Sequence, residues 1–271
     1  MLKKQAVAFI GAGFMGQALI RGLIKSGCLV AKQITISDSN ERIVSDVVSQ
    51  FKVNAAKSNE KAVERASIVI LAVKPQDLPS VIKSLGKKLG KEKLIISIAA
   101  GVTINTICDL LPEKARVVRA MPNIAATIGE SASAICLSEA ATDTDLVMAK
   151  KIFDAVGESV VVDESLMDSV TGLSGSGPAF VFVFLDALIE AGVRSGLTRE
   201  VATKLASHTM YGSAKLAIET GEKPSSIKDR VSSPGGTTLA GLSVLDTGTF
   251  KREVLKAVEA ARKRSKELSN K

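Results

Sequence analysis

The sequence predicts an α/β domain with a parallel sheet, followed by a domain made entirely of helices. Short apolar runs alternate with helical segments up to about Asp163, and from Leu166 onward nearly every segment is helical. Runs such as SIVILAV and LIISIA are continuously apolar, which is typical of parallel strands that are covered on both faces. We therefore expect two domains, over residues 1–163 and 164–271.

The first apolar run, Ala6–Ile10, leads through a glycine turn into a helical segment, Gln17–Lys25. The turn has the spacing Gly11-x-Gly13-x-x-Gly16. Between a strand and a helix, this spacing predicts a Rossmann-type dinucleotide site. The first glycine permits a tight turn, the second lets the backbone approach a pyrophosphate, and the third lets helix and strand pack closely.

Further strands are expected along the same half, at Gln33–Ser37, Ser67–Val73, Lys93–Ala99 and Arg116–Ala120. Ligands of parallel sheets lie beyond the carboxyl ends of the strands, which here carry Ala72–Pro75, Ile98–Gly101 and Met121–Asn123. Small residues and prolines at these ends would leave room for a flat cofactor, although ordinary loops have the same composition.

The cofactor's ribose is expected near Asp38 and Arg42, which follow the second strand. An acidic residue there usually holds the 2′-hydroxyl of NAD, whereas an arginine accommodates the 2′-phosphate of NADP. Both are present, and Arg42 could equally be a solvated helix residue. The residues alone leave the choice of cofactor open.

The second half is expected to be helical over Ala179–Arg194, Arg199–Thr220, Ser225–Val231, Thr237–Asp246 and Phe250–Ser269. The segment Ala179–Ala191 is apolar on almost every face, so it should be enclosed by neighbours, some of them from another subunit. The residues before it, Thr171–Pro178, are rich in glycine and serine. They suit close packing and ligand approach equally well.

The segment Val231–Leu242, VSSPGGTTLAGL, is the most informative stretch of this half. Pro234 ends any helix that comes before it, and Gly235 and Gly236 allow positive φ. Thr237 or Thr238 suits the start of the next helix. Such a turn presents several N–H groups and hydroxyls to one point, as a carboxylate or phosphate requires. A helix–helix turn capped by serine and threonine is the simpler alternative.

Composition excludes several other classes of protein. No apolar run approaches the roughly 18 residues of a membrane span, and Gly11 and Gly13 interrupt the only run near the N-terminus, so we expect a soluble cytoplasmic protein. The net charge of +8 is accompanied by one tyrosine and no tryptophan, which favours an anionic cofactor and substrate over nucleic acid. Three unclustered cysteines indicate neither a metal site nor a disulfide.

The reaction must use few acid–base groups, because the only histidine is His208, in the middle of a helical segment. Reduction of a carbonyl commonly requires a proton donor. A cyclic imine can enter already protonated, and then needs orientation, a carboxylate anchor and a hydroxyl near its nitrogen. The cluster around Thr238 supplies those groups.

The chain resembles the pyrroline-5-carboxylate reductases in the blocks FIGAGFMG, LAVKPQ, IAAGVT, MPN, DSVTGLSGSGPAF and VSSPGGTTLAGLSVLD. The resemblance implies a Rossmann domain followed by a helical domain that dimerises by interlocking helices, with dimers often joined in a larger ring. It implies reduction of L-1-pyrroline-5-carboxylate to L-proline, the last step of proline synthesis. NADPH is the implied cofactor, with NADH possible. Ile124 and Ala125 depart from the Thr-Pro that is common after MPN, which concerns the shape of that loop.

The resemblance also assigns site residues, position by position. To these we add the glycine turn, and Asp38 and Arg42 as the residues expected at the ribose. The expected cofactor contacts are Ile10, Gly11, Ala12, Gly13, Phe14, Met15, Gly16, Asp38, Arg42, Asn59, Ala72, Val73, Lys74, Pro75, Ile98, Ala99 and Ala100. The expected substrate contacts are Ser233, Gly236, Thr237, Thr238 and, in a looser match, Glu164. Thr238 is the expected catalytic residue, and no metal is expected.

Two other classes remain as alternatives. A β-hydroxyacid dehydrogenase shares the two-domain plan, but its inter-domain glycine helix carries a catalytic lysine and asparagine. Here the corresponding turn is followed by Phe180, Val181 and Phe182, which argues against that class. A non-catalytic NAD(P)H-binding regulator would need the glycine turn but not the intact SSPGGTT cluster.

Overall fold

The computed structural model describes residues 2, 5–111 and 115–269. By packing, the chain forms two compact units. The first comprises Met1–Ser176 together with Ala260–Lys271, and the second comprises Gly177–Glu259. The division into 1–163 and 164–271 was drawn from the change of pattern along the chain, and it stays a prediction.

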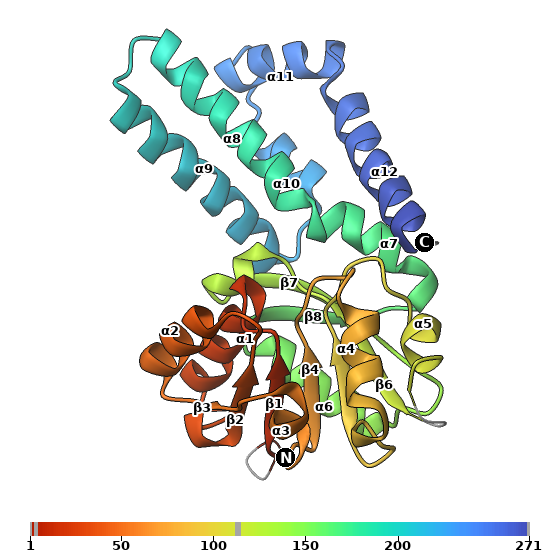
Figure 1. Cartoon of the computed structure of the whole chain (residues 1–271). Coiled ribbons are helices and arrows are strands. Elements are labelled where there is room, and N and C mark those ends of the chain that lie inside the picture. Colours follow the sequence, from red (N-terminus) through yellow and green to blue (C-terminus); the bar gives the residue numbers. More distant parts are fainter. Residues whose placement is uncertain (1, 3–4, 112–114, 270–271) are drawn as a thin grey trace. The chain divides into compact units, whose positions relative to one another are not determined.

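The described part of the first unit contains one eight-stranded sheet with the order β3-β2-β1-β4-β5-β6-β7-β8 (Figure 1). The strands are β1 (Val7–Ile10), β2 (Ile34–Ser37), β3 (Asn54–Ala55), β4 (Ile68–Leu71), β5 (Leu94–Ser97), β6 (Arg116–Met121), β7 (Ser131–Leu137) and β8 (Gly157–Val161). Strands β1 to β6 run parallel to one another. The predicted parallel strands are therefore confirmed, and β1 lies between β2 and β4, where the chain order reverses.

The sheet is mixed rather than wholly parallel, because β7 runs antiparallel to β6. The sequence did not predict β7, since residues 131–134 alternate serine and alanine and only its second half is apolar. Ser131 and Ser133 are buried, and their hydroxyl oxygens lie 3.0 Å apart. These serines satisfy each other's hydrogen bonds, so a polar sequence occupies an interior strand at little cost.

Two apolar cores cover the two faces of the sheet, and successive strand residues point into them alternately. Phe9 of β1 packs into the core under α1, α2 and α6, whereas Ile10 packs into the core under α3, α4 and α5. Ile70 and Leu71 of β4 divide in the same way. This double burial explains why the strands are apolar at every position.

The helices of the first unit connect the strands across these two faces (Figure 1). They are α1 (Phe14–Lys25), α2 (Glu41–Phe51), α3 (Asn59–Val63), α4 (Leu78–Leu85), α5 (Ile104–Cys108), α6 (Asp143–Asp154) and α7 (Met167–Val170). A π-helical turn, Thr171–Gly175, follows α7.

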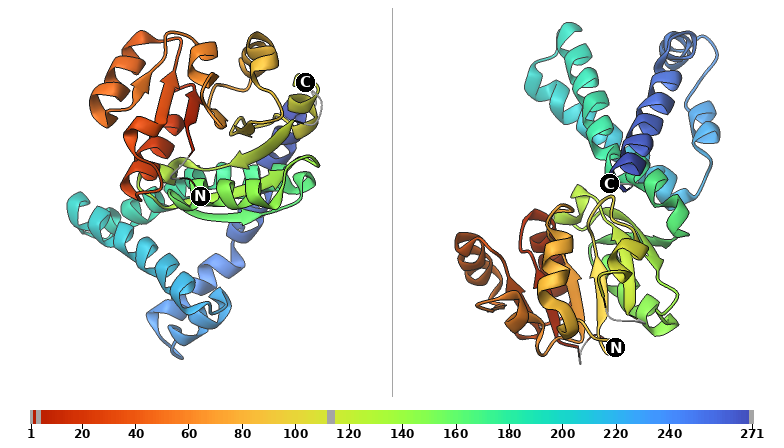
Figure 2. Two further views of the ribbon diagram at one scale, coloured as in Figure 1. Left: turned by 90° about the horizontal axis from the view of Figure 1, so that it is seen from below. Right: turned by 45° about the vertical axis from the view of Figure 1, so that its right-hand side comes forward.

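The second unit contains α8 (Gly177–Arg194), α9 (Arg199–Thr220), α10 (Pro224–Arg230), α11 (Thr237–Thr247) and the first half of α12 (Phe250–Ser269). These bounds confirm the predicted helices to within two residues. Helix α8 lies beside α9 (Figure 2), and the rings of Phe184 and Phe250 are 5.4 Å apart.

Helix α8 is apolar yet uncovered within one chain. None of its residues is buried, and Phe182 and Val183 are 60% and 72% exposed. Among the described residues, the helical segment Glu164–Arg194 is also long and apolar enough, by length and composition alone, to cross a membrane. The expectation from uninterrupted runs missed this segment, because Asp186 divides it. An apolar surface of this size requires a covering partner.

Candidate functional site

The turn between β1 and α1 is built around glycines that the fold itself requires. Gly11 has φ +91°, and a Cβ there would lie 2.6 Å from the carbonyl oxygen of Ala72. A Cβ at Gly16 would lie 2.9 Å from the carbonyl oxygen of Gly11. The first and third glycines thus bring the turn against β4 and bring α1 against the turn, as the GxGxxG spacing predicts.

Gly13 has a different surrounding. It is the N-cap residue of α1, and no atom lies within 4 Å of the position where its Cβ would be. No acidic residue occupies the first turn of α1. Exposed N–H groups at the start of a 12-residue helix, with open space above a glycine, form a cradle for an anion. The turn therefore fits a dinucleotide pyrophosphate.

Asp38 is fixed against this turn from the end of β2. Its carboxylate accepts hydrogen bonds from the backbone N–H of Ala12 at 2.8 Å and of Asn40 at 2.9 Å. Asn40 caps α2 by accepting from the N–H of Arg42, and the side chain of Arg42 is exposed. Asp38 therefore lies in the loop after β2, where two backbone N–H groups hold its carboxylate, and Arg42 lies in the first turn of α2 with its side chain exposed to solvent.

The other expected cofactor residues follow neighbouring parallel strands. Ala72–Pro75 come after β4, and Ile98–Ala100 come after β5. The N–H of Ala72 donates to Ile10, and the N–H of Ile98 donates to Leu71. Asn59 is the first residue of α3. The carboxyl ends of β1, β4 and β5 are thus brought together at one edge of the sheet, beside the point where the chain order reverses.

The MPN segment and the glycine-rich run have packing roles. The amide of Asn123 donates to the carbonyl of Ser174, and its carbonyl accepts from the N–H of Ala125. A Cβ at Gly175 would lie 2.7 Å from the methyl group of Met121. These contacts join the end of β6 to the π-helical turn. They explain why a glycine stands at position 175 and an asparagine at position 123, with no need for a ligand.

Glu164 is engaged within the first unit. Its carboxylate accepts from Arg119 at 3.0 Å and from the N–H of Ile104 at 2.6 Å. The side chain of Arg119 is only 5% exposed. The sequence did not predict this ion pair, because Arg119 is an isolated charge in an apolar strand, without a local motif. The pair gives Glu164 a structural function, and its contact with substrate stays a prediction.

The segment Val231–Leu242 forms the turn between α10 and α11 together with the first half of α11. Gly235 has φ +69°, and α11 begins at Thr237. The N-cap residue is Gly236, and no side chain caps the helix. The alternative of serine or threonine capping is therefore wrong for this helix. Its first N–H groups remain available to a ligand.

Serine and threonine hydroxyls surround that helix start. The N–H of Gly236 donates to the carbonyl oxygen of Ser233 at 3.0 Å, and the Cβ position of Gly236 would collide with the Ser233 hydroxyl. The side chains of Ser233, Thr237 and Thr238 are exposed. A negative group at this turn would meet hydroxyls together with N–H groups, which suits a carboxylate.

Other reactive groups do not form a second centre. No group of three or more His, Cys, Asp or Glu is arranged for a metal ion in the described ranges. Burial raises the pKa of the Cys136 thiol to about 12 and also raises that of Cys108. Both thiols are therefore protonated near neutral pH and are poor nucleophiles.

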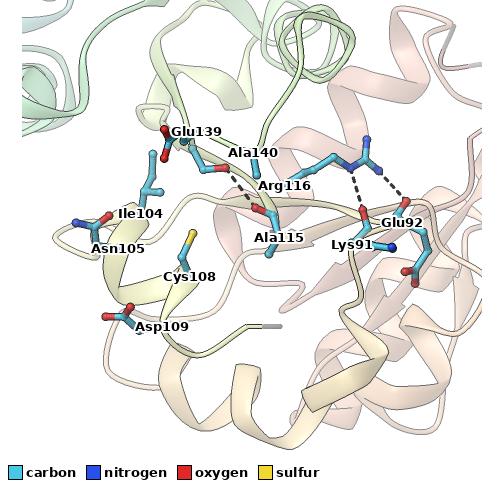
Figure 3. A pocket seen from close by; sticks show the side chains of 11 residues that line it. Lys91, Glu92, Ile104, Asn105, Cys108, Asp109, Ala115, Arg116, Glu139 and Ala140 are labelled. Carbon is cyan, nitrogen blue, oxygen red and sulfur yellow. Dashed lines mark hydrogen bonds between the residues drawn. The ribbon is translucent and has the colours of Figure 1, made fainter. Parts of the chain in front are cut away.

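A wide pocket of about 1100 Å³ lies near the amino ends of β5 and β6 (Figure 3). Arg116 crosses it and donates to the carbonyl oxygens of Lys91 and Glu92. Arg116 also pairs with the buried Asp145 at 2.8 Å. The pocket contains none of the expected site residues, and its arginine is already bound by three partners.

Comparisons with known proteins match both parts of the chain. Residues 164–268 match the family model "pyrroline-5-carboxylate reductase dimerisation", and residues 6–101 match "NADP oxidoreductase coenzyme F420-dependent". The pyrroline-5-carboxylate reductase of Methanosarcina acetivorans is 47% identical over 100% of both chains. That of Escherichia coli is 36% identical over 98% of this chain and 99% of its own. The chain belongs to the pyrroline-5-carboxylate reductase family.

Solved structures agree with this assignment. The reductase of Coxiella burnetii has 33% identity and a TM-score of 0.94, covering 98% of this chain and 99% of its own. The pyrroline carboxylate reductase of Plasmodium falciparum, a structure with NADP bound, has 31% identity and a TM-score of 0.88. It covers 99% of this chain and 100% of its own. The Rossmann-type domain and the helical domain of the sequence prediction are both confirmed.

Proposed function

We propose that this chain reduces L-1-pyrroline-5-carboxylate to L-proline with a reduced nicotinamide cofactor, as the final step of proline biosynthesis. The observation that carries the proposal is membership of the reductase family over the full length of the chain. The cluster Ser233–Thr238 supports it independently, because an uncapped helix start among hydroxyls suits a small amino-acid carboxylate.

NADPH is the proposed cofactor, with NADH as a second possibility. Residues 6–101 match a family model of NADP oxidoreductases, and the Plasmodium relative was solved with NADP. In this chain the glycine turn would hold the pyrophosphate, Asp38 and Arg42 would face the ribose, and Ala72–Pro75 with Ile98–Ala100 would contact the nicotinamide half. Asn59, at the start of α3, would be a further cofactor contact. When bound, the cofactor supplies the hydride.

The residues of the α10–α11 turn would hold the substrate. The N–H group of Thr237 and the hydroxyl of Ser233 would bind the carboxylate beside Gly236, whose own N–H donates to the carbonyl oxygen of Ser233. The hydroxyl of Thr238 would bind the ring nitrogen and orient the C=N bond. A ring nitrogen that is already protonated needs no acid at the moment of reduction. The hydroxyl of Thr238 would therefore position the imine and would not serve as the proton donor.

We also propose that the protein works as a homodimer in the cytoplasm, with dimers joined into a larger ring. The dimerisation model covers α8 to α12, and the uncovered face of α8 supplies the apolar surface that a subunit contact needs. A second subunit would also account for the apolar segment Glu164–Arg194 without a membrane.

The test is turnover by the purified chain with pyrroline-5-carboxylate. We expect loss of NADPH absorbance at a rate matched by the formation of proline. Oxidation of β-hydroxyacids in its place would indicate the β-hydroxyacid dehydrogenase class. Binding of NADPH without turnover of either substrate would indicate a regulator, and either result would overturn the proposal.

A further inference from the structure

The last turn of α12 lies directly on the turn that follows β5. Gly101 has φ +73°, and a Cβ there would lie 3.2 Å from the Cβ of Leu268 and 3.7 Å from the backbone nitrogen of Ser269. These residues all belong to the first unit. Within the first unit, the end of α12 therefore packs against the turn at the carboxyl end of β5.

A hydrogen-bonded latch fixes this helix end. Ser265 is only 4% exposed, and its hydroxyl donates to the Asp168 carboxylate at 2.6 Å. The hydroxyl of Ser269 lies 3.4 Å from the same carboxylate oxygen. Asp168 follows Met167, which is 1% exposed and belongs to the core beneath α4 and α5. The latch thus ties α12 to an anchored helix.

The space beside this contact is bordered by two loops of the proposed cofactor site. A cavity of about 520 Å³ is lined by Pro75 from the loop after β4, by Ala100 and Gly101 from the turn after β5, and by Leu268 of α12. Ala99 is buried in the core. Pro79 of α4 and Thr106 of α5 also line the cavity, and Leu268 of α12 is the side chain that lies against the Gly101 end of the turn.

We propose that Leu268, held by the Asp168–Ser265 latch, is a positioning residue for the nicotinamide half of the cofactor. It fixes the turn Ile98–Gly101 in the conformation that binds the cofactor. A glycine with positive φ is mobile when unsupported, because both halves of its conformational range are open to it. Loss of the leucine side chain would let the turn populate conformations that bind NADPH poorly. The inference rests on the proposed function, since it takes NADPH as the ligand of this turn.

If Leu268 had only a structural role, its removal would change the stability of the fold and not the affinity for NADPH. Removing a partly exposed leucine lowers the stability of the fold, but it leaves the affinity of the folded protein unchanged. A positioning role changes the dissociation constant of NADPH while the fold persists. The KM for pyrroline-5-carboxylate should move little, because its proposed contacts lie on the α10–α11 turn.

The experiment measures the dissociation constant of NADPH by direct titration in the absence of substrate, at a temperature where circular dichroism shows each variant folded. Leu268→Ala and Asp168→Ala, which removes the acceptor of the Ser265 hydroxyl, should raise this dissociation constant by about five- to twentyfold, as small misplacements of a site do. Leu268→Met should restore native affinity. Ser84→Ala is the matched control, since the Ser84 hydroxyl bonds only the carbonyl of Val81 on the exposed side of α4.

Combining Asp168→Ala with Leu268→Ala should add little to either change, because both release the same turn. Native affinity in folded Leu268→Ala protein overturns the inference and leaves the proposed function intact. Failure of the native chain to bind NADPH overturns the cofactor assignment, and this inference with it. If Leu268→Met raises the dissociation constant of NADPH as much as Leu268→Ala does, the positioning role of Leu268 is also contradicted.

Discussion

At the scale of single residues, the glycine turn separates the requirements of folding from those of binding. Gly11 and Gly16 are confined by backbone atoms, whereas Gly13 faces open space. Gly13→Val should therefore fold normally and abolish NADPH binding, because the new side chain occupies the space that the phosphate needs. Titration with NADPH beside a thermal melt measures both properties. The comparison variant Gly11→Val should lose stability as well, since its φ of +91° is strained for valine.

A folded Gly13→Val protein with unchanged affinity would show that the pyrophosphate lies elsewhere. The two outcomes are easily distinguished, because the thermal melt reports the fold without any ligand.

Asp38 and Arg42 should set the preference between NADPH and NADH. Asp38→Asn keeps an oxygen acceptor for the N–H of Ala12 but removes a charge that would repel a 2′-phosphate. We expect the ratio of NADPH to NADH affinity to rise by about tenfold, or about 1.4 kcal/mol. Arg42→Ala should lower the same ratio if its guanidinium meets the phosphate. Equal changes for both cofactors would make Arg42 a solvated helix residue.

Thr238→Ala should lower kcat/KM for pyrroline-5-carboxylate by about 10- to 100-fold, on the order of 1.4–3 kcal/mol of transition-state stabilisation. The reason is loss of the hydroxyl that orients the ring nitrogen. Affinity for NADPH should hardly change, and Thr238→Ser should retain most activity. Ser233→Ala should act mainly on KM, because a carboxylate contact is much the same before and during hydride transfer. Normal turnover by Thr238→Ala would refute this placement of the substrate.

At the scale of elements, the sequence predicts those strands and helices whose residues form a local pattern. Apolar runs located β1, β2, β4, β5 and β6, and helical periodicity with glycine and proline stops located the helices of the second half. Strand β7 was not predicted, because two of its buried residues, Ser131 and Ser133, are polar and bond to each other. The antiparallel β6–β7 pairing depends on contacts between strands, which no local pattern records.

In the candidate site, too, features with a local motif were predictable and features made by distant residues were not. The glycine turn and the SSPGGTT turn were predictable, since their chemistry lies within a few adjacent residues. The partners of Glu164 were not, because Arg119 and Ile104 are 45 and 60 residues away along the chain. The contact of Leu268 with Gly101 spans most of the chain, and neither residue carries a motif that would announce it.

At the scale of the whole molecule, the apolar faces of the second unit are its dominant feature. A groove of about 640 Å³ is lined almost wholly by apolar side chains, including Phe180 and Phe184 of α8, Met210 of α9, Leu245 of α11 and Phe250 of α12. Leaving such a surface in water is unfavourable by roughly 25 cal/mol for each Å² of apolar area. A second copy of the chain, covering this surface with its own, removes that cost.

We therefore expect light scattering to show no monomer of the native chain at micromolar concentration. Phe182→Glu should dissociate or unfold the protein, because a subunit contact over α8 would bury a charge without a partner. Val160→Glu provides the control, since Val160 is 53% exposed on the edge strand β8 of the first unit, and it should leave the assembly unchanged. A stable and active native monomer would contradict the dimer. Equal dissociation by both variants would show that added charge acts generally and that α8 is not the contact.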